Sequence, residues 1–181
     1  MEDQRIVELF FARSEQAVAA LDEKYGSLLF RISDNILQND LDAAECVNDT
    51  YLGVWNAVPP ARPSPLCAFV CRIARNLSLK RYRERTAQKR GPALPLEELA
   101  GCIPAPSAED VLSARELGQA ICRFLDGLDR ESRVLFLRRY WFSDPVKDIA
   151  VRLGVSENTV SARLRRLRIR LQQYLQKEGF P

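Results

Sequence analysis

Apolar residues recur every three or four positions along most of this chain, which places them on one face of an α-helix. A short apolar helix or arm comes first, and Ser14 is then a suitable N-cap for the longest periodic run. Nothing in the pattern has the period of two that a half-buried strand requires. The pattern therefore predicts an all-α protein, with helices over residues 14–37, 41–58, a stretch from Pro65, 107–126, a stretch after Asp129, 144–154 and 156–175.

The predicted helices fall into two groups, separated by a segment rich in proline and glycine. Residues 91–106 contain Gly91, Pro92, Pro95, Gly101, Pro104 and Pro106. Both residue types interrupt helices, and their clustering between periodic segments is typical of a linker. Apolar residues within it, such as Leu99, allow it to lie against a partner. The expected organisation is an N-terminal helical domain over residues 1–90, a linker over residues 91–106 and a C-terminal helical domain over residues 107–181.

The last two predicted helices carry start and stop signals at close spacing. Asp144 is a suitable N-cap, and Pro145 suits the first helical position, where its missing N–H would have no helical partner. Gly154 stands where a helix end favours a left-handed residue, and Ser156 is a suitable cap for the next helix. The small Ala150 allows the two helices to approach closely. These signals predict a helix-turn-helix unit in the C-terminal domain.

The second helix of this unit has an outward face that is polar and basic. Its side chains are Glu157, Asn158, Ser161, Arg163, Arg165 and Arg166. Such groups bond base edges and phosphates when a helix enters the major groove of DNA. The alternative is an ordinary amphipathic helix pair with a solvated basic face. Because caps, proline, glycine and basic surface all agree, we favour DNA binding.

Charge is unevenly distributed along the chain, although the formal net charge is only +3. Arginines crowd residues 72–90 and 163–170, whereas acids dominate residues 40–49 and 97–110. This asymmetry indicates two basic DNA-facing surfaces and an acidic face for a protein partner. No apolar run approaches the roughly 20 residues that span a bilayer, and the first residues are acidic, unlike those of a signal peptide. We therefore expect a cytoplasmic protein without direct membrane insertion.

The sequence offers little for catalysis. It contains no histidine, which removes the commonest general base. Its five cysteines lack paired metal-ligand spacing, so we interpret them as small buried hydrophobic residues. A zinc site or a redox switch at Cys67 and Cys71, one helical turn apart, is the alternative. We expect no catalytic residue, no metal and no cofactor.

Three blocks of sequence follow one another in an informative order. They are residues 42–55, residues 66–77 with the run Arg-Ile-Ala-Arg-Asn, and residues 128–140 followed by the helix-turn-helix. Together they resemble the extracytoplasmic-function (ECF) sigma factors of bacterial RNA polymerase, a branch of the sigma-70 family. By this resemblance the first block grips the largest polymerase subunit, the second reads and opens the minus-ten promoter element, and the third binds the minus-thirty-five element.

The resemblance also implies which residues make these contacts. Those for core RNA polymerase are Asp42, Glu45, Asn48, Asp49 and Leu52. Those for minus-ten DNA, in the helix that follows a proline-rich loop at residues 59–65, are Arg72, Arg75, Asn76, Lys80 and Arg83. Those for minus-thirty-five DNA are Ser156, Asn158, Thr159, Ser161, Arg163 and Arg166. An anti-sigma factor is a further partner expected from the family.

Two other classes of protein were weighed against a sigma factor. A two-domain helix-turn-helix transcription regulator, which does not replace the polymerase sigma subunit, would share the C-terminal half but has no need of residues 42–55 and 72–76. A nucleic-acid enzyme would want clustered carboxylates with a metal or a phosphate-cradling loop, and only Asp42, Glu45 and Asp49 come near this. The sequence therefore favours an alternative sigma factor that directs promoter recognition, promoter opening and transcription initiation, and not an enzyme.

Overall fold

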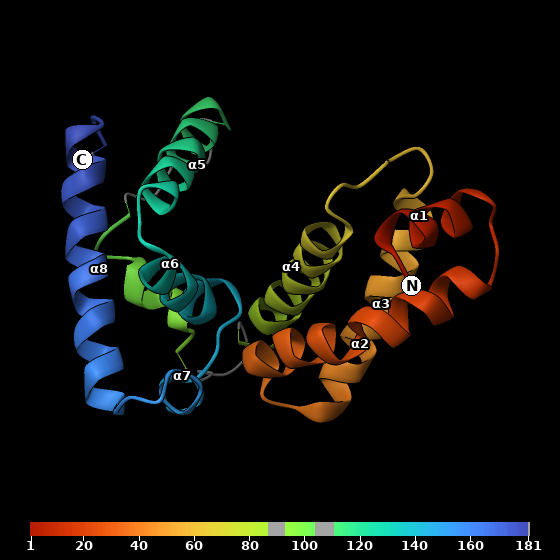
Figure 1. Ribbon diagram of the computed structural model, residues 1–181, viewed down its shortest axis with the longest axis horizontal. Coiled ribbons are helices and arrows are strands. Elements are labelled where there is room, and N and C mark those ends of the chain that lie inside the picture. The colour runs from red at the N-terminus through yellow and green to blue at the C-terminus, as the bar shows by residue number, and fades with distance from the viewer. Residues whose placement is uncertain (87–92, 104–110, 181) are drawn as a thin grey trace. The chain divides into compact units, whose positions relative to one another are not determined.

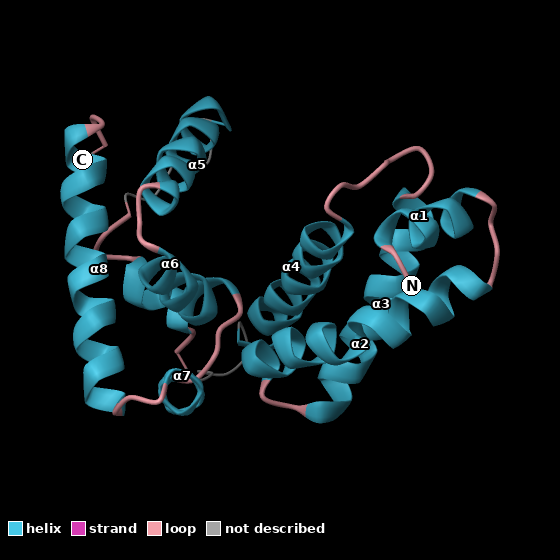
Figure 2. Cartoon of the chain, in the orientation of Figure 1, coloured by secondary structure: helices cyan, strands magenta, loops and turns pink. Residues whose placement is uncertain are grey.

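The computed structural model describes residues 1–86, 93–103 and 111–180 of the chain. The chain divides into two compact units, Met1–Pro92 and Ala93–Pro181, and each is described by itself. Every regular element within the described residues is helical (Figure 2), which confirms the prediction of an all-α protein with two helical domains. In those same ranges, no helix combines the length and the apolar character needed to cross a bilayer.

The described part of the first unit is a small helical bundle (Figure 1). Its helices are α1 (Asp3–Phe11), α2 (Gln16–Leu37), α3 (Asp40–Ala57) and α4 (Leu66–Thr86). Helices α2, α3 and α4 all pack against one another, and α1 packs on α2 and α4. The bundle buries Phe10, Leu21, Leu29, Ile32, Ile36, Val54 and Val70. Leu21, Leu29, Ile32 and Ile36 recur at helical spacing, so α2 turns one apolar face into the bundle.

The start of α2 differs from the prediction, because Ser14 is not its N-cap. The helix begins at Gln16, and Glu15 stands at the cap position without a side-chain hydrogen bond. The Ser14 backbone carbonyl instead accepts from the Ala17 amide at 2.9 Å, a bond that tightens the first turn. The start of α3 is capped by Asn39, whose side chain accepts from the Asp42 amide at 2.9 Å.

Gly26 lowers the helix propensity of α2, and the structure gives a reason for its presence. A Cβ atom at this position would lie 2.3 Å from Oδ1 of Asp22 and 3.2 Å from the hydroxyl oxygen of Tyr51. That hydroxyl donates to the same Asp22 oxygen at 2.5 Å, which links α3 to α2. Gly26 therefore makes room for a hydrogen bond between two packed helices, at the cost of backbone entropy.

The described part of the second unit consists of six helical segments. They are η1 (Pro95–Leu99), α5 (Val111–Asp126), α6 (Arg130–Phe136), the π-helical η2 (Leu137–Trp141), α7 (Val146–Leu153) and α8 (Glu157–Lys177). Their core contains Leu117, Phe124, Leu135, Ile149, Val160, Leu164, Leu167 and Leu171. The start of the helix predicted over residues 107–126 lies outside the described residues. Helices α7 and α8, which pack on each other, are the predicted helix-turn-helix.

The turn of this helix-turn-helix has most of the predicted chemistry. Gly154 ends α7 in the left-handed conformation, with φ of 65°. The Ser156 hydroxyl caps α8 by accepting from the Thr159 amide at 3.2 Å. Asp129 caps α6 in the same way, accepting from the Ser132 amide at 2.9 Å. These three signals are confirmed because each acts between residues that are close in sequence.

The predicted cap at Asp144 is wrong. Helix α7 begins at Val146, and Pro145 occupies the cap position, where its carbonyl accepts from the Ile149 amide at 3.1 Å. The Asp144 carboxylate is buried and accepts from Nη1 of Arg138 at 2.7 Å. A buried carboxylate is stabilised more by a charged donor than by a backbone amide, so this side chain turns inward.

Part of the segment predicted as a linker belongs to the second unit. Its ends, residues 91–92 and 104–106, lie outside the described residues. Between them, Leu99 is only 4% exposed and lies in the core of the second unit. The neighbouring Glu98 accepts from the guanidinium groups of Arg139 and Arg168 and, at 3.2 Å, from the Tyr140 hydroxyl. These contacts fasten η1 to η2 and α8.

Candidate nucleic-acid and protein interfaces

Helix α3 presents an exposed face that combines leucines with polar residues. Leu41 is 82% exposed and Leu52 is 58% exposed, which is unusual for large apolar side chains. Glu45 and Asn48 lie between them at helical spacing, and Asp49 lies beside them, all three exposed. An exposed apolar surface with acidic residues suits a protein partner that offers apolar and basic groups.

Two of the acids predicted for polymerase contact are already paired within the unit. Nη1 of Arg85 lies 3.2 Å from Oδ2 of Asp42, and Nε of Arg81 lies 3.8 Å from the other carboxylate oxygen. Arg81 also forms an ion pair with Glu45. These arginines come from α4, so the pairs join α3 to α4 and reduce the negative charge available to a partner. No local sequence pattern signals these pairs, because the partners lie on different helices, 36 and 43 positions apart in the chain.

The residues predicted to contact minus-ten DNA gather along α4. Arg72, Asn76, Lys80 and Arg83 recur at helical spacing and are all exposed. Arg75 is half-buried, and burial together with the charge of Arg83 lowers the pKa of its guanidinium. The structure therefore brings four of the predicted residues onto one solvent-facing row and places the fifth beside it. Their contact with DNA stays a prediction.

Five of the six predicted minus-thirty-five residues lie in the first half of α8, and the sixth, Ser156, is the N-cap of this helix. Asn158, Ser161 and Arg166 are exposed. The hydroxyl groups of Ser156 and Thr159 lie 2.9 Å apart, and Thr159 is half-buried, so these two side chains also hold the start of the helix. The N-terminal half of a recognition helix is the part that reaches base edges in the major groove.

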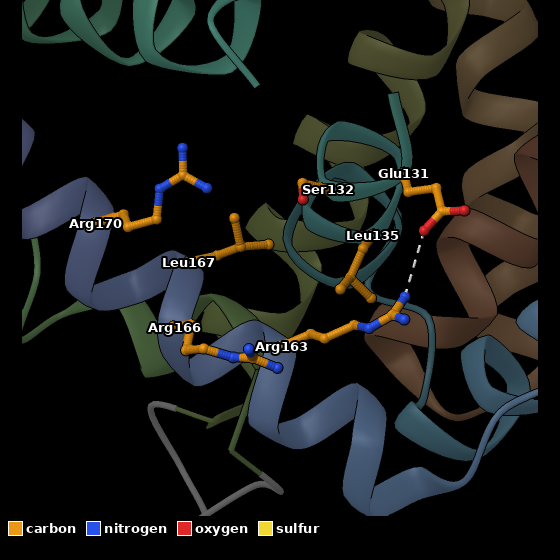
Figure 3. A pocket seen from close by; sticks show the side chains of 7 residues that line it. All are labelled: Glu131, Ser132, Leu135, Arg163, Arg166, Leu167 and Arg170. Carbon is orange, nitrogen blue, oxygen red and sulfur yellow. Dashed lines mark hydrogen bonds and ion pairs between the residues drawn. The ribbon is translucent and has the colours of Figure 1, made fainter. Parts of the chain in front are cut away.

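A hollow of about 260 Å³ lies between α6 and α8 (Figure 3). It is lined by Glu131, Ser132, Leu135, Arg163, Arg166, Leu167 and Arg170. Figure 3 shows three guanidinium groups around it, from side chains spaced along one side of α8. The arrangement suits an anion such as a DNA phosphate. Arg170 is not among the residues predicted from the sequence, although its position seven residues after Arg163 places it on the same side of the helix.

Arg163 has an acidic neighbour in this hollow. Its Nη1 lies 3.5 Å from Oε2 of Glu131, and the Glu131 side chain is 79% exposed. An exposed pair at this distance contributes little stability, since water screens it. The guanidinium can therefore exchange this carboxylate for a phosphate or a base edge.

The cysteines divide into more classes than the sequence predicted. Cys46 and Cys71 are buried, but Cys122 is exposed, so the interpretation of all five as buried residues is wrong. Cys122 lies on the side of α5 opposite to Leu117 and Phe124, the residues that enter the core. The Sγ atoms of Cys67 and Cys71 lie 4.0 Å apart. Burial is the main cause that raises the pKa of the Cys71 thiol to about 12, and the nearby Cys67 thiol is the second cause. Within the described residues, no group of three or more His, Cys, Asp or Glu could hold a metal ion.

Fold and surfaces together define a two-unit helical protein with a helix-turn-helix and exposed basic faces. Comparison with protein families then narrows this class. Residues 21–88 match Sigma-70 region 2, and residues 119–171 match Sigma-70 region 4. The chain therefore belongs to the sigma-70 family, and it is an alternative RNA polymerase sigma factor.

Relatives with curated names place it in the ECF branch of that family. The chain is 29% identical to ECF RNA polymerase sigma factor SigE of Mycolicibacterium smegmatis, over 94% of this chain and 68% of the relative. It is 29% identical to the ferric citrate uptake sigma factor FecI of Escherichia coli, over 68% of this chain and 70% of the relative. It is 27% identical to ECF RNA polymerase sigma factor SigL of Mycobacterium tuberculosis, over 85% and 88%. A regulator that leaves the polymerase sigma subunit in place is not favoured.

Proposed function

We propose that this ECF sigma factor binds core RNA polymerase through the exposed face of α3 and reads promoter DNA with α4 and α8. The observation that carries the proposal is the presence of both sigma-70 regions, in order, on one chain. Each region presents its own exposed polar surface. This division assigns one protein-binding surface and two DNA-binding surfaces to separate helices.

The polymerase surface consists of Asp42, Glu45, Asn48, Asp49 and Leu52, extended by Leu41. Its two exposed leucines would lose water on docking, which supplies the apolar part of the binding free energy. Asp49 and Asn48 add polar contacts on the same face. Because Asp42 and Glu45 already pair with arginines of α4, we expect them to contribute less than Asp49.

The row of Arg72, Asn76, Lys80 and Arg83 on α4, with Arg75 beside it, faces the minus-ten element. Guanidinium and ammonium groups neutralise the phosphates of a separated strand, and the bases of such a strand offer faces and edges that a duplex hides. Binding to this opened form shifts the equilibrium from closed to open promoter, because a ligand stabilises the state that it binds more tightly.

Helix α8 enters the major groove of the minus-thirty-five element. Asn158, Ser161 and Arg163 lie toward its N-terminal end, where side chains reach base edges, and Arg166 lies one turn further on. Because each unit reads a short element, promoter choice requires both elements at a fixed spacing. In the proposed function this chain itself makes and breaks no covalent bond, so it is not an enzyme. We place it in the cytoplasm with the polymerase, subject to an anti-sigma factor.

The test is transcription reconstituted from purified components. The full chain and core polymerase are given a library of random promoters, and the transcribed sequences are recovered. We expect enrichment of two short elements at one spacing. If roughly 6 phosphates are neutralised, the logarithm of the binding constant should fall against the logarithm of salt concentration with a slope of about −5. DNA binding without measurable affinity for core polymerase would sink the proposal and favour a regulator.

A further inference from the structure

Two carbonyl groups in the last turn of α3 lack backbone amide partners, because two prolines follow this helix. In a continuing helix, the amides of residues 59 and 60 would bond the carbonyls of Trp55 and Asn56, but Pro59 and Pro60 have no N–H. Arg13 supplies a donor from outside the helix, since its Nη1 donates to the Trp55 carbonyl oxygen at 2.6 Å. The helix dipole also favours a cation at this end.

Arg13 comes from the short connection after α1 and is held firmly there. Its guanidinium carbon lies 5.3 Å from the centroid of the Trp55 ring. The Phe10 ring packs edge-on against the same indole at 6.1 Å, and Phe10 is fully buried. Arg13 adopts a φ of 52°, which is uncommon for a residue other than glycine. It is the left-handed residue that ends α1, where its amide donates to the Phe10 carbonyl at 3.1 Å and the Ser14 amide donates to the Leu9 carbonyl at 3.0 Å. This helix ending sets the Arg13 backbone, and the Arg13 side chain reaches the end of α3.

A second contact reaches the loop between α3 and α4, which Figure 1 draws beside α1. The guanidinium carbon of Arg62 lies 4.0 Å from the centroid of the Phe11 ring, within the range of a cation–π interaction. One residue earlier, the Ala61 amide donates to the Ala57 carbonyl at 3.0 Å. Phe11 at the end of α1 therefore contacts the loop at Arg62, and Arg13 just after α1 contacts the last turn of α3 that leads into the loop.

We propose that Phe11 and Arg13 are positioning residues, which hold the loop of residues 58–65 for the minus-ten element without contacting DNA. The inference rests on the proposed function, in which this loop leads into the basic row of α4. A loop without regular hydrogen bonding has many conformations, and only a few present their groups at hydrogen-bond distance from a base. Anchoring by α1 selects one of them before DNA arrives, so the N-terminal helix sets promoter preference.

The first experiment measures that preference in the full chain with core polymerase. The template is a promoter library randomised at the minus-ten positions and constant elsewhere. We expect Arg13→Ala to reduce discrimination between the best and the average minus-ten sequence by about tenfold. Affinity for core polymerase and the midpoint of thermal unfolding should change little. Arg13→Lys keeps a charged donor and should restore part of the discrimination.

The matched control is Arg5→Ala on α1, the helix that precedes Arg13. Arg5 pairs with Glu8 on the surface of α1, at 3.0 Å, and both side chains are at least half exposed. Like Arg13→Ala, the Arg5→Ala variant removes one positive charge, but it leaves the end of α3 and the loop untouched. We expect its minus-ten preference to equal that of the unaltered chain.

A double-mutant cycle tests the contact at Phe11. Phe11→Leu removes the aromatic face but keeps apolar packing, and Arg62→Ala removes the cation. If Phe11 acts through Arg62, Phe11→Leu should lower discrimination alone but add nothing in the Arg62→Ala background. Fully additive effects would show that Phe11 acts by another route and would overturn its assignment.

Exchange of the Ala61 amide with solvent provides a readout independent of transcription. Arg13→Ala should speed this exchange by about tenfold, because the loop opens more often without its anchor. Unchanged exchange, or unchanged preference, overturns the inference. So does an equal loss on every promoter together with a lower unfolding midpoint, which would mark a general folding role. If the unaltered chain starts no transcription, the proposed function has failed, whereas the anchor itself is judged by Ala61 exchange.

Discussion

Arginines on one side of α4 and on one side of α8 have different surroundings. On α4, Arg81 and Arg85 turn toward α3 and bond its acids, and Arg85 also donates to the Leu37 carbonyl at 2.7 Å. On α8, Arg166 and Arg170 line an open hollow, and the acid beside Arg163 is itself exposed. The same residue type at similar helical spacing is thus structural where an acidic helix packs alongside, and open to a ligand where none does. A run of charged residues can therefore be interpreted only when the element that packs against it is known.

The largest expected effect concerns Asp144 in the second unit. Its buried carboxylate pairs with an arginine within its own unit, as the acids of α3 pair with Arg81 and Arg85 of α4. Asp144→Ala should destabilise this unit by about 3 kcal/mol, because it leaves the Arg138 guanidinium without its buried carboxylate. In a Trp55→Phe background the remaining tryptophan is Trp141, so urea unfolding followed by its fluorescence reports the second unit. Asp148→Ala, at an exposed position of α7, is the control and should cost less than about 1 kcal/mol.

Local signals explain how much of the fold could be predicted. Gly154 and Ser156 act on neighbours within a few residues, and the structure has both as predicted. Asp144 fails as a cap because a tertiary partner, Arg138, competes for its carboxylate. Cys122 fails as a core residue because composition alone says nothing about which side of α5 it lies on. Prediction succeeds for caps and turns, whose partners lie within a few residues on the same turn, and fails where packing between elements decides the direction of a side chain.

The candidate site shows the same limit. The exposed positions on α3, α4 and α8 follow from helical periodicity and from family resemblance. The pairs of Arg81 and Arg85 with acids of α3 join residues 36 and 43 positions apart, and no local pattern signals them. Arg168 bonds Glu98 across 70 positions, which carries part of the predicted linker into the second unit. The way the helices pack within each unit, and not a local sequence pattern, determines these contacts.

A second prediction separates the protein surface from the DNA surfaces. Asp49→Arg reverses an exposed charge on α3 and should weaken binding to core polymerase by about tenfold, the effect of a charge reversal at a polar interface. Binding of the same variant to an isolated minus-thirty-five duplex should not change. Both are measured by titration at one salt concentration. Equal weakening of both would indicate that α3 does not form a separate surface.

A third prediction reverses this pattern in the second unit. Arg163→Ala should weaken minus-thirty-five binding by about tenfold and leave affinity for core polymerase unchanged. Arg166→Ala should reduce the salt slope of DNA binding by about 1, if its contact is to a phosphate. Titrations over a range of salt concentrations measure both. An Arg163→Ala variant with full affinity would show that its pair with Glu131 holds the guanidinium away from DNA.

The smallest effects sharpen the comparison within a single helix. Lys80 and Arg85 both lie on α4, but Lys80 is exposed with a 3.9 Å partner, whereas Arg85 bonds α3 and the end of α2. Arg85→Ala should therefore lower the stability of the first unit by about 1 kcal/mol and leave promoter opening nearly unchanged. Lys80→Ala should lower this stability by less than about 0.5 kcal/mol but reduce open-complex formation a few-fold.

Urea unfolding in a Trp141→Phe background, followed by Trp55 fluorescence, measures the stability of the first unit. Cleavage of unpaired bases by permanganate measures promoter opening. Because both variants remove one positive charge from the same helix, a difference between them reports the direction of each side chain and not the net charge. If Lys80→Ala and Arg85→Ala behave alike, charge alone governs α4, and whether a cation bonds α3 or faces solvent has no functional meaning there.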